Sequence, residues 1–410
     1  MPMTGSSIHT IEAKTGLTKA IFPDAFLVSL YRAQAPYRGC GHGCTYCDGR
    51  AEKYYVEGCF ERDLSVRENL PGLVSADILR GVASREYGAI CIGSGVTDVY
   101  QPLEKELELT RRTLQALIPA RLPVVILSKS ALILRDFDLL AQFPRVLVIV
   151  TVTTTDVETA GILEPGASTP GDRLEVVRRA KEAGFFTGVM AMPLCPGISD
   201  APEQSRALFD ASRSAGADFV FPGGLTLRPG RQKDLFLAMV DERYPGLAPL
   251  YQDVYRENRP SGSPLASYAN PVMKDWNTYL ENRRIPGMIP HFVYRELLSL
   301  PDSLFVLLQH LRSLYSMKGV DTRPLVKASG LYGTWLKANR TALRRKRIAQ
   351  LDSDPFPITR ILTEKLVGIC NTQGGFGVLC GNPKLGRLVS SIVNEGACFD
   401  YPTLTSAQRS

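Results

Sequence analysis

Short apolar runs alternate with amphipathic segments over the first 235 residues of the chain. Apolar and β-branched runs that are bounded by Gly, Pro or polar residues predict strands. These strands are expected at 26–31, 89–92, 124–127, 146–152, 187–192 and 219–221. Apolar positions with helical spacing fall between them, at 74–86, 103–117, 131–141, 173–183 and 203–215. The first part of the chain is therefore expected to alternate strands with helices.

Strands that are separated by helices pair in parallel, because each helix returns the chain to the same edge of the sheet. Six such units predict an α/β fold, a partial (β/α)6 barrel of the TIM type. Ligands of such barrels bind in the loops at the carboxyl ends of the strands. The segments that follow the predicted strands are therefore the places to look for chemistry.

The regular alternation fades after residue 225. Residues 246–290 are rich in Pro, Asn, Tyr and Ser, and we expect a long irregular connection there. Helical patterns return at 301–317 and 325–351, and a Gly-rich tail with three cysteines follows. We therefore expect a core domain at 1–235 and a mainly helical C-terminal region at 236–410.

Composition indicates a globular protein that does not cross a membrane. Of the 410 residues, 44% are hydrophobic and 22% are charged, and no apolar run reaches the roughly 18 residues that a membrane helix needs. The N-terminal sequence MPMTGSSIHT lacks the features of a signal peptide. A soluble, cytoplasmic protein is expected, in which nine cysteines indicate metal binding, chemistry or core packing rather than disulfides.

Charge is distributed unevenly along the chain. The net charge is +7, but residues 1–235 carry 26 Lys and Arg against 27 Asp and Glu. Residues 236–410 carry 22 against 14 and hold the whole positive excess. The C-terminal half could therefore attract an anionic partner.

The sequence PYRGCGHGCTYCDGR follows the first predicted strand and contains Cys40, Cys44 and Cys47. Three thiolates on such a Gly-rich loop can hold one corner of a 4Fe-4S cluster, and the glycines let the backbone curl around it. The fourth iron would then be open to the amino and carboxylate groups of S-adenosylmethionine. A zinc site with His42 as fourth ligand is the alternative, and it fits less well because structural zinc prefers paired Cys-x2-Cys ligands.

The cysteine spacing, with an aromatic residue before the last cysteine, resembles the radical S-adenosylmethionine (radical SAM) superfamily. Four further segments resemble its spore photoproduct lyase-like branch, which includes DNA repair photolyase-like proteins. These segments are SGVTDVYQPLEKELELTR, LSKSALILRD, LEPGASTPGDRLEVVRRAKEAG and MPLCPGISD. The likeness spans about the first 235 residues and implies a 4Fe-4S cluster on the three cysteines and S-adenosylmethionine as cofactors.

The resemblance also implies contacts to S-adenosylmethionine. The superfamily usually places a loop that contacts the methionine amino group after the second strand. The acidic residue expected there is missing, so Ser94, Thr97 or Asp98 should supply the polar contacts. Lys129 ends the third strand and is expected to pair with the methionine carboxylate. A solvated surface lysine is the alternative.

Other positions are expected around the nucleoside. Thr153 and Thr155 end the fourth strand and could bond the ribose hydroxyls, although β-propensity alone explains threonines there. Glu164 and Arg173 could form an ion pair that shapes the cofactor pocket, or a surface pair of little energetic value. Tyr46, just before the last loop cysteine, is expected to pack beside the cofactor.

Two cysteines of the core domain are candidates for hydrogen-atom transfer. Spore photoproduct lyase uses a cysteine as hydrogen donor, but the equivalent position here falls near Val96, which argues against the DNA-lyase reaction. Cys91 lies within a predicted strand and is expected in the core. Cys195 follows the fifth strand and is the candidate catalytic residue, in a thiyl role. In the tail, Cys370, Cys380 and Cys398 could bind a second cluster or simply pack.

The segment WLKANRTALRRKRI predicts an amphipathic helix. Leu336 and Leu343 are expected to face the core. The cations on its other face form a stripe that could contact the phosphates of a nucleic acid, or could simply be solvated. The stripe consists of Lys337, Arg340, Arg344 and Arg347.

The expected function is that of a radical SAM enzyme which cleaves S-adenosylmethionine to a 5′-deoxyadenosyl radical. An electron donor of the flavodoxin or ferredoxin type is the expected partner. The narrower alternative is a spore photoproduct lyase-like enzyme that repairs or modifies nucleic acid. The other alternative is a non-catalytic protein that binds metal or nucleic acid.

Overall fold

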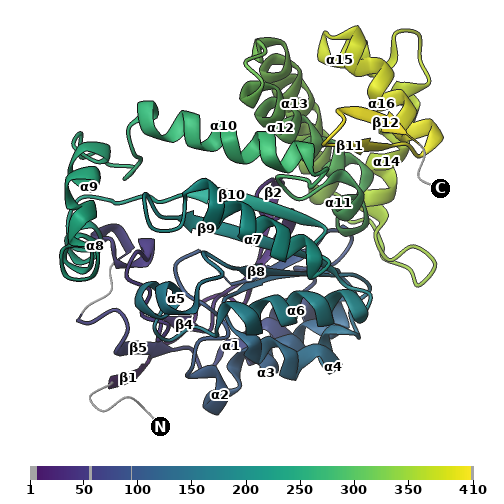
Figure 1. Ribbon diagram of the computed structural model, residues 1–410. Helices are drawn as coiled ribbons and strands as arrows, with labels where there is room; N and C mark the ends of the chain where they lie inside the picture. The colour runs from purple at the N-terminus through teal and green to yellow at the C-terminus, as the bar shows by residue number, and fades with distance from the viewer. Residues whose placement is uncertain (1–6, 55–57, 94, 408–410) are drawn as a thin grey trace.

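The computed structural model describes residues 7–54, 58–93 and 95–407 and is built around one seven-stranded sheet (Figure 1). The strands follow the order β10-β9-β8-β7-β6-β3-β2, and the six from β3 to β10 are parallel. Strand β2 joins the β3 edge in antiparallel orientation. The bounds are β2 Leu17–Asp24, β3 Ser29–Ala33, β6 Ile90–Ile92, β7 Val124–Ser128, β8 Val146–Thr151, β9 Phe186–Leu194 and β10 Phe219–Gly224. Six parallel strands joined by helices are the arrangement of a partial (β/α)6 barrel, as predicted.

Burial on both faces explains why these strands are continuous apolar runs. All six residues of β8 are buried, as is typical of parallel strands that are covered on both sides. The strand predicted at 26–31 is misplaced, because residues 25–28 form the turn between β2 and β3. Strand β2 itself was missed, since its burial pattern shows no clean alternation.

Helices cover the outer face of the sheet between successive strands. They are α1 (Leu70–Leu79), α2 (Glu104–Leu107), α3 (Leu109–Leu117), α4 (Phe137–Leu140), α5 (Val157–Leu163), α6 (Pro170–Glu182) and α7 (Pro202–Ser214). The helix predicted at 131–141 is mostly a 3-10 turn over Ala131–Asp136, and α5 was not predicted. The Thr169 side chain caps α6 by accepting a hydrogen bond from the Asp172 N–H at 3.1 Å.

A small second sheet lies beside the cysteine loop. Its strands are β1 (Ser7–Thr10), β5 (Asp63–Val66) and β4 (Tyr37–Arg38), in that order. Strand β4 leads directly into the loop. The small sheet therefore fixes the chain where it enters the segment that carries Cys40, Cys44 and Cys47.

Residues 246–290 are not an irregular connection, contrary to the prediction. Helix α8 (Arg231–Arg243) is followed by α9 (Ala248–Val254) and α10 (Ala266–Asn282). Helix α10 tolerates Pro271 within it and buries Trp276 and Leu280, which are four residues apart on one face. Pro and Asn therefore gave a misleading loop signal, because the tertiary packing of this face decides the structure.

The C-terminal region forms a helical layer at the amino ends of the barrel strands (Figure 1). Its elements are α11 (His291–Leu297), α12 (Leu300–Met317), α13 (Arg323–Arg345), α14 (Pro357–Cys370), α15 (Gly375–Cys380), α16 (Pro383–Glu395), β11 (Cys398–Asp400) and β12 (Thr405–Ala407). Leu298 bridges Gly88, just before β6, and the ring of Phe292 lies 6.4 Å from that of Phe186 at the start of β9. This layer closes the barrel opposite the carboxyl ends of its strands. Among the described residues, no helix is long and apolar enough to span a membrane.

A buried charge cluster joins this layer to the core and corrects the predicted basic stripe. Arg340 is 1% exposed and donates to the Asp302 carboxylate at 2.7 Å, and its Nε lies 2.9 Å from Glu86 Oε2. Arg344 Nε also donates to Glu86, at 2.7 Å. Burial alone would raise the pKa of Glu86, but its partners Arg344, Arg340 and Lys19 outweigh burial and lower it. Two of the four stripe cations are thus structural.

The other two stripe residues, Lys337 and Arg347, are exposed to solvent. Lys337 is exposed on α13, whereas Arg347 lies beyond the end of that helix. Leu336 and Leu343 face the core, as expected. The stripe is not a continuous basic face, because the arginines nearest the core pair with carboxylates that the sequence separates from them by many residues.

Replacing Arg340 with Ala should destabilise the fold strongly, because it leaves Glu86 and Asp302 buried with fewer cations. Breaking a buried pair in this way costs about 3–5 kcal/mol. Chemical unfolding of the variant measures the effect, with Lys337→Ala as the exposed control that should change little. Equal small losses in both variants would show that the cluster does not join the two regions.

Candidate active site

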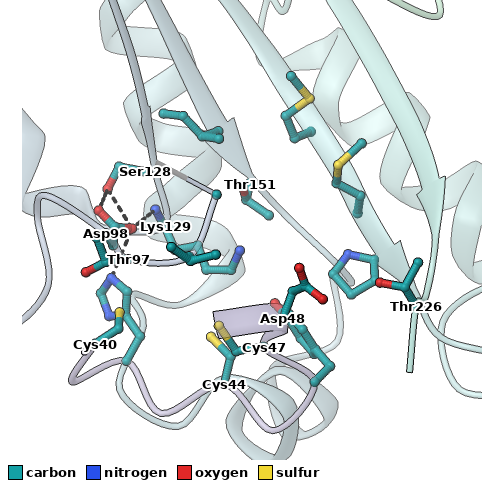
Figure 2. A pocket seen from close by; sticks show the side chains of 18 of the residues that line it. Cys40, Cys44, Cys47, Asp48, Thr97, Asp98, Ser128, Lys129, Thr151 and Thr226 are labelled. Carbon is teal, nitrogen blue, oxygen red and sulfur yellow. Dashed lines mark hydrogen bonds and ion pairs between the residues drawn. The ribbon is translucent and has the colours of Figure 1, made fainter. Parts of the chain in front are cut away.

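A cavity of 270 Å³ opens at the carboxyl ends of the parallel strands (Figure 2). Thiols of the cysteine loop line one side, and residues from the ends of β7 to β10 line the other. Figure 2 shows the sulfur atoms of Cys44 and Cys47 lying together, with Cys40 farther along the loop. The strand residues that line it include Leu127, Ser128, Lys129, Thr151, Met190, Met192 and Gly224.

The cysteine loop keeps its curvature through backbone contacts. Gly39 and Gly43 have φ values of 79° and 63°, which residues with a Cβ rarely adopt. The Arg50 guanidinium donates to the carbonyl oxygens of Gly43 and Cys44, each at 3.0 Å. Gln101 accepts from the Gly41 N–H at 2.7 Å. Arg50 and Gln101 were not predicted as site residues, because nothing local in the sequence marks a side chain that binds loop carbonyls or amides.

Asp98 ties this loop to the end of β7. Its carboxylate accepts from the Lys129 N–H at 2.7 Å, the Tyr100 N–H at 2.8 Å and the Ser128 hydroxyl at 2.9 Å. His42 Nε2 lies 3.1 Å from the same carboxylate. Burial raises the pKa of Asp98, but His42 and the hydrogen bonds outweigh burial and lower it. Asp98 was predicted as a cofactor contact, and it lines the cavity, yet its oxygens are largely engaged by the protein.

Each ring nitrogen of His42 lies within hydrogen-bond distance of an oxygen acceptor. Nε2 faces the Asp98 carboxylate, and Nδ1 lies 2.9 Å from the carbonyl oxygen of Gly166. The ring is therefore occupied and does not offer the fourth ligand that a zinc site on this loop would need.

Gly166 brings the loop after α5 against the cysteine loop. A Cβ on Gly166 would lie 2.4 Å from the Gly41 carbonyl oxygen, so only glycine fits there. The Gly166 N–H donates to the His42 carbonyl at 2.9 Å. The two loops are packed backbone to backbone, and this contact explains the glycine in the LEPGAS segment.

Glu164 and Arg173 form a buried ion pair, not a surface pair. Glu164 Oε2 lies 2.6 Å from Arg173 Nη2, and neither side chain is more than 1% exposed. Tyr46 donates its hydroxyl to the other Glu164 oxygen, and Arg173 donates to the Thr151 carbonyl at 2.9 Å. Burial raises the pKa of Glu164, but Arg173 and Lys129 more than compensate and lower it. The pair fixes the Tyr46 ring between the cysteine loop and β8.

Lys129 reaches into the cavity beside the thiols (Figure 2). Its Nζ lies 5.7 Å from the centre of the Tyr46 ring. Among the described residues no carboxylate comes within ion-pair distance of this cation, which is therefore available to an anionic ligand. The surface alternative does not apply, because the side chain is only partly exposed and faces the cavity.

The donor set fits a cluster better than a single metal ion. Within the described part of the chain, no three His, Cys, Asp or Glu side chains converge on one point that could hold a single ion. A cubane cluster needs separated thiolates, because each binds a different iron. Burial raises the pKa of all three thiols, that of Cys40 to about 12. Such thiols lose their protons only when a metal compensates the thiolate charge.

Of the other residues predicted to contact S-adenosylmethionine, some line the cavity and others do not. Thr97 lines the cavity and donates its hydroxyl to the Gly39 carbonyl at 2.7 Å. Ser94 lies outside the described residues. Thr153 and Thr155 do not line the cavity, whereas Thr151 does. Thr153 is fully buried beyond the end of β8, whose last residue is Thr151.

Cys195 does not reach the cavity. It is fully buried in an apolar cluster with Tyr251 and Tyr255, and burial raises its pKa well above the ordinary value. Cys91 lies in the core of the barrel, where burial raises its pKa to about 11. A thiyl role of Cys195 in this cavity would require the cluster of tyrosines to rearrange.

The three tail cysteines lie within the helical layer. Cys370 and Cys380 pack in the same apolar core, and the Cys398 thiol lies 3.6 Å from His291 Nδ1. Desolvation raises the pKa of Cys380 to about 12. These surroundings are those of packed core thiols.

Comparison with known proteins decides the family. Residues 35–208 match the sequence pattern of the radical SAM superfamily. The chain thus contains a radical SAM domain over these residues. It is therefore an enzyme, and its cofactors are a 4Fe-4S cluster and S-adenosylmethionine.

Relatives of this radical SAM enzyme occur in bacteria, archaea and viruses. An uncharacterized protein of Mycobacterium tuberculosis is 29% identical over 259 residues, which cover 62% of this chain and 74% of the relative. One of Methanocaldococcus jannaschii is 31% identical and covers 40% and 60% of the two chains. The radical SAM Nα-GlyT isomerase of Pseudomonas phage M6 is 23% identical, with coverages of 60% and 51%.

A solved structure shares the fold. Spore photoproduct lyase complexed with dinucleoside spore photoproduct superimposes with a TM-score of 0.50 at 14% identity. The match covers 68% of this chain and 80% of that structure. The similarity supports the partial barrel.

Replacing Lys129 with Ala should weaken S-adenosylmethionine binding without lowering iron content. Loss of one charge-assisted hydrogen bond costs about 1.5–3 kcal/mol, which is roughly a ten- to hundredfold rise in Kd. Equilibrium dialysis on the reconstituted protein measures this, with the exposed Lys105→Ala as control. An unchanged Kd for Lys129→Ala would mean that the methionine carboxylate binds elsewhere.

Proposed function

We propose that this radical SAM enzyme is cytoplasmic and uses a 5′-deoxyadenosyl radical to abstract a hydrogen atom from an organic substrate at the barrel mouth. When bound, the cluster supplies one electron to the sulfonium of S-adenosylmethionine, which breaks a carbon–sulfur bond and yields that radical. Three thiols on one wall of a single cavity, with the strand ends opposite, are the observation that carries the proposal.

The protein contributes position and shielding. Cys40, Cys44 and Cys47 would hold the cluster, and Lys129 would orient the methionine carboxylate in its cavity. Leu127, Met190, Met192 and Pro193 give the opposite wall an apolar surface that keeps water from a reactive radical. The Glu164–Arg173 pair keeps the Tyr46 ring fixed while the cofactor binds. An acidic one-electron donor of the flavodoxin or ferredoxin type is the expected partner.

Replacing any one of Cys40, Cys44 or Cys47 with Ala should abolish formation of 5′-deoxyadenosine from S-adenosylmethionine and dithionite. The loss follows because two thiolates do not hold the cluster stably. Liquid chromatography with mass detection measures the product. Cys59→Ala is the matched control, since Cys59 follows the same loop but does not line the cavity. Full activity in any of the three variants would refute the ligand assignment.

Nucleic acid is a second candidate substrate, supported by one surface feature. Arg345, Lys346 and Arg347 are consecutive, exposed cations at the end of α13, in the half of the chain that carries the positive excess. Phosphate contacts of this kind give binding without sequence preference. This run takes the place of the predicted stripe, of which Arg340 and Arg344 are engaged in the buried cluster.

Reversing the three charges, with Glu at each position, tests this candidate. Affinity for a labelled DNA duplex should fall for all sequences, and the wild-type log Kd should change with log salt by about 0.9 for each phosphate contacted. Fluorescence anisotropy measures both quantities. Reversal of Lys105, Arg112 and Arg121 in the core domain is the control. Binding that depends on neither salt nor the run would eliminate nucleic acid as the partner of this surface.

A further inference from the structure

A second cavity, of 440 Å³, lies at the edge of the sheet next to β10. Helices α10 and α12 form its sides, and the loop at 287–289 and the turn between β2 and β3 complete it. In Figure 1, α10 lies over β10. We call this space the edge cavity. Its size suits a ligand of the dimensions of a cofactor or drug.

Exposed apolar side chains gather in the edge cavity. Phe26 is 44% exposed, Met273 is 44% exposed and Met317 is 43% exposed, although each is large and apolar. Trp276 and Phe221 also line it. A contiguous apolar surface that is left open to solvent marks a binding site more often than a scattered one does. Aromatic rings and flexible thioethers together favour a flat apolar group, because methionine adapts to its outline.

Among the described residues that line the edge cavity, Arg312 is the one charged side chain. Arg312 lines the cavity and is exposed, and within the described residues it makes no ion pair or side-chain hydrogen bond. No Asp or Glu is among the described residues that line the space. The Asn277 and Gln309 amides also line the space, and their NH2 groups donate to the Met273 carbonyl and to the Ser329 hydroxyl. The cavity therefore complements an anionic group attached to an apolar body.

His310 at the base of the edge cavity serves a positioning role. Burial lowers its pKa to about 4, so the ring is neutral near pH 7. Its Nε2 lies 2.7 Å from the Ala25 carbonyl oxygen and donates to it, while Nδ1 accepts from the Tyr401 hydroxyl at 2.7 Å. The hydrogen bond between His310 and Ala25 holds the β2–β3 turn, which contains Phe26, against α12.

The edge cavity adjoins the active site through one side chain. Phe26 lines both cavities, and its ring packs edge-on against Phe221 at 5.3 Å. The Phe26–Phe221 pair spans the gap between β10 and the β2–β3 turn, which is the open side of the partial barrel. A molecule that extends from the edge cavity past Phe26 would enter the space between the thiols and the strand ends.

We propose that the edge cavity binds the distal part of the substrate, and that this part is an organic anion with a flat apolar body. The reacting carbon would lie beyond Phe26, in the cavity of the three thiols. This assignment rests on the proposed function for the place of the reaction, and it adds the chemical class of the molecule that reacts.

Two fluorescent probes test this class directly. 8-Anilinonaphthalene-1-sulfonate has a flat apolar body with one anionic group, and N-phenyl-1-naphthylamine has the same body without it. Arg312→Gln should raise the Kd of the sulfonate by about three- to tenfold, as expected for loss of one exposed charge-assisted contact, and leave the neutral probe unchanged. Ser313→Trp, which fills the mouth of the edge cavity, should abolish the strong binding of both.

The control is Arg387→Gln, the same substitution at an exposed arginine on α16 away from the edge cavity. Circular dichroism checks that each surface variant is folded. Equal sulfonate affinity in Arg312→Gln and Arg387→Gln would overturn the anion assignment. Unchanged binding of both probes in Ser313→Trp would show that they bind elsewhere and would overturn the site.

The link to the substrate has its own test. Both cavities must be filled at once during turnover, so saturating S-adenosylmethionine must leave the affinity of the reconstituted enzyme for the sulfonate probe unchanged or increased. Competition between the two would overturn the assignment. Failure of the proposed function is seen separately, as absence of 5′-deoxyadenosine in the wild-type enzyme that still binds the probe.

Discussion

The buried carboxylate of Asp98 is the constraint on which the active site depends. It accepts hydrogen bonds from the backbone and hydroxyl at the end of β7 and pairs with His42 in the cysteine loop. A carboxylate in this position is costly to bury unless every oxygen is satisfied, so the loop and the strand end must meet in one geometry. The cysteines are thereby held at the carboxyl edge of the parallel sheet, where barrel ligands bind. The Glu164–Arg173 pair likewise ties the cysteine loop to the end of β8, because Glu164 accepts a hydrogen bond from Tyr46 and Arg173 donates to the Thr151 carbonyl.

The C-terminal region covers the amino ends of the barrel strands and packs into the same core. Its helices cover the amino ends of the strands and share an apolar core with Val125, Leu147 and Met190 of the inner face. Arg340 secures that contact through Glu86 and Asp302. The same region supplies one side of the edge cavity through α12. The barrel mouth is therefore left for the cluster and cofactor, while the open side is shaped jointly by core and C-terminal helices.

The cysteine loop and the six parallel strands could be predicted because both are local patterns: a spacing of thiols and continuous apolar runs. The structural role of Arg340 could not be predicted. A cation on an amphipathic helix has the same sequence pattern whether or not distant carboxylates fold against it. The choice between Thr151 and Thr153 depends on where β8 ends, because residues two apart share a face of a strand and only Thr151 belongs to it. Helix α10 was hidden by Pro271 and Asn270, whose loop preference is overridden by the burial of Trp276. The edge cavity arises only where five segments meet that are distant in the sequence: the β2–β3 turn, β10, α10, the loop at 287–289 and α12.

Iron and sulfide analysis of the anaerobically reconstituted protein, together with electron paramagnetic resonance of its reduced form, measures whether Cys40, Cys44 and Cys47 hold one cluster that binds S-adenosylmethionine. We expect a single 4Fe-4S cluster per chain, with about four irons and four sulfides, because the tail cysteines pack in an apolar core instead of facing a second site. We also expect that addition of S-adenosylmethionine changes the resonance spectrum, since the cofactor would bind at the iron that has no thiolate ligand. Zinc in place of iron, a second cluster, or a spectrum unaffected by S-adenosylmethionine would contradict these expectations.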